Sequence, residues 1–421
     1  MKTQHEKDWN ELYAKIKERG ASNTGLYEAI EDYYTLYEDK LLIWLAGLYD
    51  SKSGGFYYSN SAKLNEKREF NGKEYALLPD IESTHQAMCL LVASKVFEHH
   101  SDLPDKMKQG IQRFATSLLD KENGFFYHPQ WGKEMTDERQ PRRGRDLTWG
   151  LMISKNLGFE YPYPTARDRI ANSDKSEKNE NNVVPDYLRS EKAFRKYLSE
   201  FNWVTESYYA GNAIAAQAPM IIAAGLADVT ADFLNSIQDK ESGLWGEQRG
   251  YMAINSYLKI SGFYDFAKTP IPGAERAAIS VLDCATTDEE VDTVCFQYNV
   301  WYSLCNISRN LIAYGGDKGK KDAEELSSLI LKNATRAVVA SKEKVNKFKK
   351  PDASFSYMQR RTSPGSQGMP VALPDTNEGD VNASIICTAG ICENIFNALS
   401  LPMPPLFSER AKDVFLESAE L

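Results

Sequence analysis

A turn of nearly the same sequence occurs three times in this chain. Its copies are Asp50-Ser-Lys-Ser-Gly-Gly-Phe56, Asp120-Lys-Glu-Asn-Gly-Phe-Phe126 and Asp239-Lys-Glu-Ser-Gly-Leu-Trp245. The Asp is typical of an Asx turn, the glycine four residues later of a left-handed backbone, and the aromatic ring of a buried turn. A fainter fourth copy begins at Asp352 and lacks the glycine. A recurring turn implies a recurring unit, here a helical hairpin of roughly 40 to 60 residues.

Two classes of helix are predicted between the turns. The first class begins with a polar cluster and continues almost wholly apolar, over residues 82–91, 146–153, 211–222, 251–260, 297–304 and 380–387. A helix that is apolar on nearly all sides is buried on nearly all sides. The second class is more amphipathic and covers 27–49, 104–119, 190–208, 227–237, 273–285 and 320–341. Six buried helices inside six surface helices predict an all-α double ring, an (α/α)6 toroid, with an irregular helical bundle as the alternative.

The pattern predicts a single domain over residues 1–421. One stretch interrupts it, because residues 165–190 are polar and lack apolar periodicity. We expect this stretch to be a solvated loop, either a lid over a cavity or a tolerated insertion.

Composition excludes several classes of protein. Hydrophobic residues at 42% and charged residues at 26% are ordinary for a soluble globular protein. A net charge of −9 disfavours nucleic acid and anionic membranes as partners. No segment approaches the ~20 apolar residues of a membrane span, and the N-terminus lacks the apolar core of a secretory signal. The 6 cysteines lack paired spacing and indicate a reducing compartment, so we expect a cytoplasmic protein.

Six inner and six outer helices joined by glycine-aromatic turns resemble the α/α toroid. Terpenoid cyclases, protein prenyltransferases, six-hairpin glycosidases and several polysaccharide lyases share this architecture. The turns at Gly54, Gly124 and Gly243 are similar to degenerate copies of the cyclase and prenyltransferase repeat. The chain has neither D-x-D-D nor D-D-x-x-D, and its histidines do not stand in the zinc patterns of prenyltransferases or lanthionine cyclases. We therefore expect neither terpenoid nor zinc chemistry, and no metal or other cofactor.

The resemblance implies where a site would lie, since the cavity of such a toroid opens where the inner helices begin. The polar clusters would then meet at one mouth. Carboxylates, amides, arginines and aromatic rings together suit a polyhydroxylated ligand. The catalytic candidates are Asp80, Glu82, His85, Glu378 and Asp380, and the substrate-binding candidates are Arg143, Arg145, Trp149, Asn212, Tyr251, Asn255, Gln297, Asn299, Trp301 and Asn382.

Each candidate also has a structural explanation. Asp80 and Asp380 are natural helix N-caps, and a carboxylate such as Glu82 is favoured in the first turn of a helix without any catalysis. His85 could equally be a structural residue whose hydrogen bonds are made within the protein. The basic run 142–145 suits an ion-pair cluster.

Three functions fit these candidates. Glycoside hydrolysis needs two carboxylates, here Asp80 or Glu82 opposite Glu378 or Asp380. A lyase acting on a uronate needs a base, His85 or Tyr251, and a neutralising cation, Arg143 or Arg145. A non-catalytic toroid would bind a glycan or a protein. Because the net charge disfavours a polyanionic substrate, an intracellular glycoside hydrolase acting on oligosaccharides is the favoured prediction, and the sequence leaves the oligomeric state open.

Overall fold

The computed structural model describes residues 3–21, 25–64, 66–128, 130–133, 140–172, 184–366 and 369–419. These residues are mostly helical. Within them, strands are confined to two short antiparallel pairs, β1 (Lys67–Phe70) with β2 (Lys73–Ala76) and β3 (Gly365–Ser366) with β4 (Met369–Pro370). The prediction of an all-α fold is confirmed.

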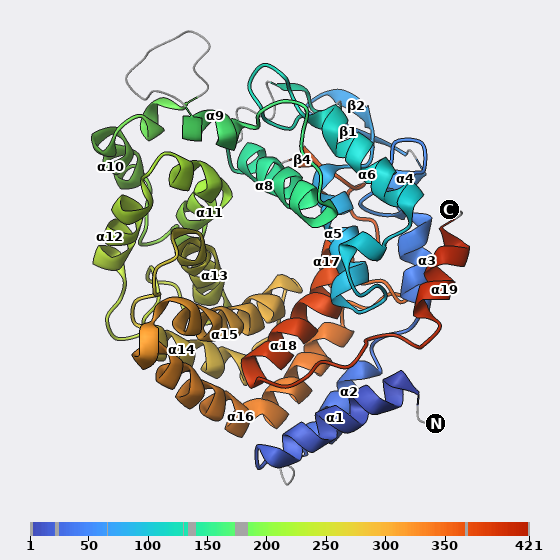
Figure 1. Ribbon diagram of the computed structural model, residues 1–421, viewed down its shortest axis with the longest axis vertical. Coiled ribbons are helices and arrows are strands. Elements are labelled where there is room, and N and C mark those ends of the chain that lie inside the picture. The colour runs from blue at the N-terminus through green and yellow to red at the C-terminus, as the bar shows by residue number, and fades with distance from the viewer. Residues whose placement is uncertain are drawn as a thin grey trace.

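Six helical segments contact one another in chain order, and the last contacts the first. Figure 1 shows them arranged around a central opening. Because the sequence makes these segments apolar on most sides, they pack against neighbours both along the ring and outside it. They are α5 (Ile81–Ala93), α8 (Gln140–Leu157), α11 (Ser207–Ala223), α13 (Gly250–Ala267), α15 (Cys295–Tyr314), and a last segment made of α17 (Val381–Ile385), the π-helical η3 (Ile386–Gly390) and α18 (Ile391–Leu399).

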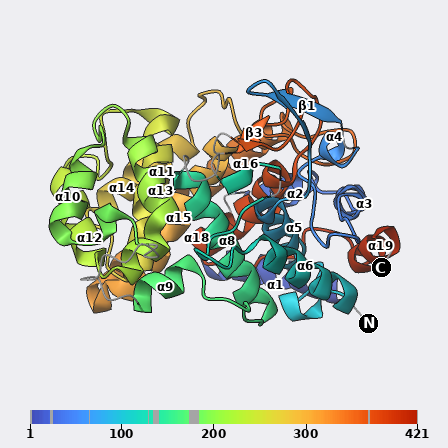
Figure 2. The ribbon, with the colours of Figure 1, turned by 90° about the horizontal axis from the view of Figure 1, so that it is seen from above.

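The remaining helices lie outside this ring (Figures 1 and 2). Three of them, α6, α12 and α14, each contact the inner helix that follows them in the chain, and α16 contacts α15, the inner helix that precedes it. Both chain ends lie on the same side of the ring, near α19. The outer elements are α1 (Gln4–Glu18), α2 (Leu26–Tyr34), α3 (Lys40–Gly47), α4 (Asn60–Lys63), η1 (His100–Asp102), α6 (Asp105–Leu118), α9 (Ala166–Asn172), η2 (Asp186–Leu188), α10 (Glu191–Ser199), α12 (Ala227–Ile237), α14 (Ala274–Ala285), α16 (Gly316–Asn346) and α19 (Ala411–Ser418).

The three repeated turns have the predicted geometry. In each, the Asp carbonyl accepts the N–H of the glycine four residues later, at 2.7, 2.8 and 3.0 Å, and the Asp carboxylate accepts N–H groups within the turn. The φ angles of Gly54, Gly124 and Gly243 are 89°, 78° and 72°, in the left-handed region. Each turn follows an outer helix and leads the chain back toward an inner one.

A fourth turn is present, but it is shifted relative to the prediction. Lys350 takes the position of the Asp and donates its N–H to the carbonyl of Ser354, at 2.8 Å. This turn is one residue shorter than the others, and Ala353, with φ at 65°, replaces the glycine. Asp352 lies inside the turn, where its carboxylate accepts the N–H of Ser354 at 3.1 Å. The turn therefore forms even though neither the Asp nor the glycine of the other copies stands at its position.

The prediction of one helix over 27–49 is wrong, because α2 ends at Tyr34 and α3 begins at Lys40. The break lets Tyr37 donate its hydroxyl to the carbonyl of Cys387, in η3, at 2.8 Å. It also lets Asp39 accept the N–H of Ser408, at 2.9 Å. These contacts tie the start of the chain to its end.

The prediction of an unbroken loop over 165–190 is also wrong. A helix, α9, occupies part of it, and its first turn is closed by reciprocal bonds between Thr165 and Asp168. The short η2 follows, and residues 173–183 lie outside the described residues. Two inner helices begin earlier than predicted, at Gln140 and Ser207, so the basic run 142–145 lies within α8.

Candidate functional site

The starts of the inner helices meet at one end of the ring. Side chains from the first two turns of neighbouring helices bond to each other: Asn382 accepts from Gln86 at 2.9 Å. Asn299 donates to Asn255 at 2.6 Å. Gln86 is the sixth residue of α5 and Asn382 the second of α17, and Asn255 and Asn299 are the sixth of α13 and the fifth of α15, so each bond joins the first two turns of two neighbouring helices. The predicted convergence of polar helix starts is therefore present for these residues.

A buried charge cluster connects α5 and α8. Glu82 accepts from Arg142 at 3.1 Å, contacts Arg145, and accepts the hydroxyl of Ser366 at 3.1 Å. Arg142 also donates from Nε to one oxygen of Asp146 at 3.1 Å, its Nη2 lies 2.8 Å from the other oxygen in an ion pair, and none of its side chain is exposed. Two arginines thus pair with two buried carboxylates.

The two carboxylates of this cluster differ in protonation. Burial alone would raise the pKa of Glu82, but the guanidiniums of Arg145 and Arg142 outweigh it and hold that pKa at about 2. Burial raises the pKa of Asp146 to about 7. The negative charge of Glu82 also acts to raise this pKa, whereas the positive charge of Arg142 acts to lower it. Near neutral pH, Glu82 is ionised and Asp146 takes up a proton.

Asp80 and Asp380 are the N-caps of α5 and α17. Asp80 accepts the N–H of Ser83 at 2.8 Å and its hydroxyl at 2.6 Å. Asp380 accepts the N–H groups of Ala383 at 2.7 Å and Tyr357 at 2.9 Å. Both are almost fully buried, at 3% and 0% exposure. All four oxygens are therefore used by the protein.

Glu378 lies in the loop before α17 and does not join the charge cluster. Its carboxylate accepts the N–H of Ser61 at 2.9 Å and the hydroxyl of the same residue at 2.5 Å. This contact fixes the loop to α4. The side chain is half-buried.

His85 and Trp149 stack on each other, with ring centroids 4.7 Å apart. Burial lowers the pKa of His85 to about 4, so the imidazole is neutral at physiological pH. Cys89 lies 3.4 Å from its Nε2. Trp149 also lies beside Arg145, whose guanidinium is 5.8 Å from the indole. The pair of rings therefore adjoins the charge cluster.

Three predicted ligand-binding residues belong to a buried network that points outward, to α16. Tyr251 accepts from Gln297 and from Lys344, each at 2.8 Å. Ser341 donates to Gln297 at 3.0 Å and accepts from Trp301 at 2.8 Å. Tyr251, Gln297 and Trp301 have no exposed surface. They pack inner helices against an outer one.

Arg143 and three asparagines complete the set of predicted residues. Arg143 points toward the outer layer, with its guanidinium 4.5 Å from the ring of Phe125. Asn212, Asn255 and Asn299 are buried in the inner helices, at 6–7% exposure.

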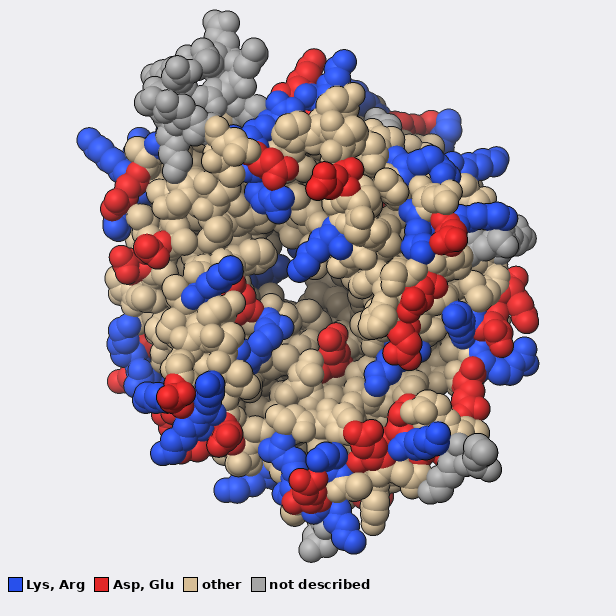
Figure 3. Space-filling view, in the orientation of Figure 1, with Lys and Arg blue, Asp and Glu red and all other residues tan. Residues whose placement is uncertain are grey.

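Figure 3 shows a hollow at the centre of the ring, with charged side chains around it. Sequence reasoning missed three of the residues that gather near Arg145 and Tyr208: Lys259 on α13, Cys295 at the start of α15, and Tyr357 before α17. Burial raises the pKa of the Cys295 thiol, and Tyr357, Lys259 and Arg145 lie close enough to oppose that rise. Lys259 did carry a signal, because it is the only charged residue between Gly250 and Tyr264.

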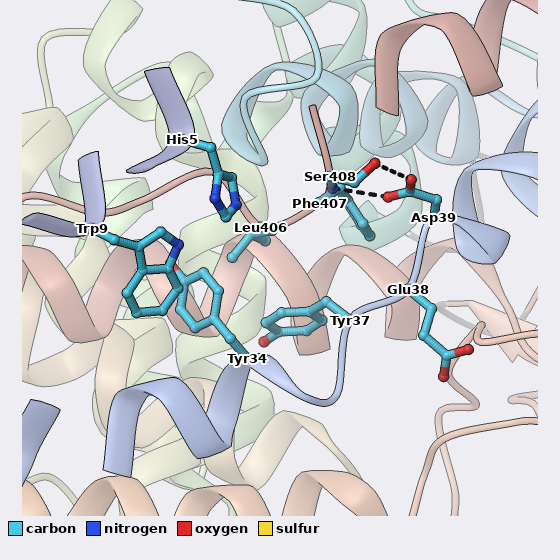
Figure 4. Close-up of a pocket in the computed structure, with 9 residues that line it drawn as sticks. All are labelled: His5, Trp9, Tyr34, Tyr37, Glu38, Asp39, Leu406, Phe407 and Ser408. Carbon is cyan, nitrogen blue, oxygen red and sulfur yellow. Dashed lines mark hydrogen bonds between the residues drawn. The ribbon is translucent and has the colours of Figure 1, made fainter. Parts of the chain in front are cut away.

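A separate groove lies at the outside of the ring, between the start and the end of the chain (Figure 4). Its volume is about 450 Å³. The rings of Trp9, Tyr34 and Tyr37 line it, and Asp39 closes one end by accepting from Ser408. It holds none of the predicted site residues.

No protein-family model, curated protein or solved structure matches this chain. Among the described residues, no three His, Cys, Asp or Glu side chains are grouped so that they could hold a metal ion. No helix in the same part of the chain has the length and apolar character that crossing a membrane requires.

Proposed function

We propose that the chain is an (α/α)6 toroid that hydrolyses a glycosidic bond of an oligosaccharide in its central hollow. The closed cycle of contacts among the inner helices supports the architecture. The bonds between their polar starts support a site at that end of the hollow.

The observation that carries the proposal is a set of buried polar atoms without partners beside the charge cluster. Gln86 Oε1, Arg145 Nε and Trp149 Nε1 make no hydrogen bond within the described part of the chain. Each such atom costs about 1–3 kcal/mol when it stays unpaired. Sugar hydroxyls both donate and accept, so a sugar offers the hydrogen bonds that one acceptor and two donors need, and an indole face suits the apolar face of a sugar ring.

Glu82 and Asp146 supply the two carboxylates that hydrolysis needs. Environments that drive two carboxyl pKa values apart separate the acid from the ionised partner. In this cluster Glu82 is the ionised nucleophile or base, and Asp146 is the proton donor. Asp80, Asp380 and Glu378 are assigned to capping and loop fixation instead, because their oxygens already accept bonds from the protein.

One observation favours a second candidate, a toroid that binds a glycan without cleaving it. The oxygens of Glu82 already contact Arg142, Arg145 and Ser366. A nucleophile must release such partners before it attacks. The lyase alternative loses two of its predicted groups, since Tyr251 and Arg143 face away from the hollow.

The test is turnover and binding on a panel of oligosaccharides, with Glu82→Gln and Asp146→Asn beside Glu378→Gln as the matched control. We expect the first two variants to lose turnover by about 10²-fold or more while binding persists, and the control to keep it. Binding without turnover by the unaltered protein would favour the second candidate. Loss of turnover in Glu378→Gln alone would move the active site to the loop before α17.

A further inference from the structure

Lys259 is a cation on an inner helix without an anionic partner among the described residues. Its Nζ lies 5.8 Å from the centre of the Tyr208 ring, and no ion pair to it is present. Its backbone packs beside Gly211 of α11, where a Cβ would lie 3.1 Å from the Cβ of Lys259. A small neighbour thus leaves room for this lysine within a crowded helix pair.

Arg145 is the second cation on this side of the cluster. Its side chain keeps 20% exposure, whereas Arg142 has none. One end of its guanidinium contacts Glu82, and its Nε remains unpaired. Arg145 therefore has hydrogen-bonding capacity left after its ion pair is made.

The two cations act on each other. Burial lowers the pKa of Lys259 to about 8, and the positive charge of Arg145 is the second largest cause. The carboxylate that partly offsets this is Glu82, which is already bonded to Arg142, Arg145 and Ser366. The local arrangement therefore favours an added anion, although the whole chain is negative.

We propose that the oligosaccharide bound in the hollow carries a carboxylate, as a uronic acid residue does, and that Lys259 and Arg145 hold this group. This inference rests on the proposed function for the site, and it adds the substrate class. A planar carboxylate matches one ammonium and the free edge of one guanidinium. Tyr208, whose ring centre lies 5.8 Å from Lys259 Nζ, offers a ring and a hydroxyl to the same sugar.

Calorimetry on the full chain tests the inference with three matched ligands: a uronate oligosaccharide, the same oligosaccharide with its carboxyls reduced to alcohols, and a sulfated neutral oligosaccharide. We expect the uronate to bind about tenfold or more tightly than its reduced form. Lys259→Met should abolish this preference and leave the affinity for the reduced form unchanged. Lys259→Arg should retain part of it, and Lys192→Met, on the exposed side of α10, all of it.

Each of the remaining outcomes refutes either the carboxylate site or the proposed function. Equal binding of both forms, unaffected by Lys259→Met, refutes the carboxylate site while the proposed function stands. Tighter binding of the sulfated ligand refutes the carboxylate as the group recognised. Failure of every saccharide to bind refutes the proposed function together with the inference. If Lys259→Met lowers the melting midpoint by more than a few degrees, the Lys259→Arg variant and the comparison of the three ligands still decide whether the carboxylate site exists.

Discussion

Asp80 and Asp380 occupy equivalent positions in the first and the last inner helix. Each donates its N–H to the carbonyl of the turn aromatic, Phe56 at 3.3 Å or Phe355 at 2.8 Å. In each case the hydroxyl four residues after the Asp accepts the N–H of that same aromatic, at 2.9 and 3.1 Å. The turn and the helix start are therefore one repeated device, in which the Asp holds the helix.

This equivalence predicts that Asp80→Ala and Asp380→Ala lower the free energy of unfolding by about 0.5–2 kcal/mol each. The Asn variants should lose less, because Asn is a comparable N-cap. Urea unfolding measures the difference. Turnover by Asp80→Asn on any cleaved glycoside should stay near that of the unaltered protein. If turnover is lost while stability is unchanged, Asp80 is a catalytic residue after all.

Replacing Arg142 should destabilise the protein strongly. Arg142→Met leaves Glu82 and Asp146 buried with one cation between them, and a buried carboxylate deprived of its partner costs about 3–5 kcal/mol. Arg195→Met is the control, because Arg195 pairs with Glu191 on an exposed helix face. We expect this control to change stability by no more than about 0.5 kcal/mol. Similar effects of the two variants in urea unfolding would show that the cluster is well hydrated.

Asp146 should make stability fall as pH rises. Its pKa, about 7 in the folded protein, lies above the ordinary 3.8, so the folded state binds this proton more tightly than the unfolded state does. The contribution is complete below about pH 4 and is lost as pH rises through about 7. Unfolding free energies across this window should fall for the unaltered protein relative to Asp146→Asn. A constant difference between the two would contradict the raised pKa.

Much of the fold was predictable, because a helix buried from two sides must be apolar around most of its surface. The six inner segments and the three glycine turns follow from this pattern and from turn chemistry. The break at 35–39 did not, since it depends on Tyr37 reaching Cys387, which lies 350 residues away in the chain. The fourth turn was misplaced because Ala353 takes a left-handed backbone that its residue type does not announce.

The site was only partly predictable, because the rotational phase of a helix decides which side chains face the hollow. Tyr251 and Met252 are adjacent, and 100° of rotation separates them. Tyr251 is fully buried toward α16, whereas Met252 is 43% exposed. An inner helix that is apolar nearly all round gives little evidence of this phase. Lys259 is the exception, since a single lysine in such a helix must point to the side with room for its charge.

The turn glycines test how the hairpins dock on one another. A Cβ on Gly243 would lie 2.6 Å from the backbone nitrogen of Ala277 on α14, and φ there is 72°. Gly72, in the β1–β2 hairpin, has nearly the same φ, 73°, and nothing within 4 Å of its Cβ position. Gly72→Ala should therefore report only the left-handed strain, about 1–2 kcal/mol. Gly243→Ala should add the displacement of α14 and cost clearly more in urea unfolding. Equal costs would mean that the turn does not rest on α14, and that backbone conformation alone selects glycine at this position.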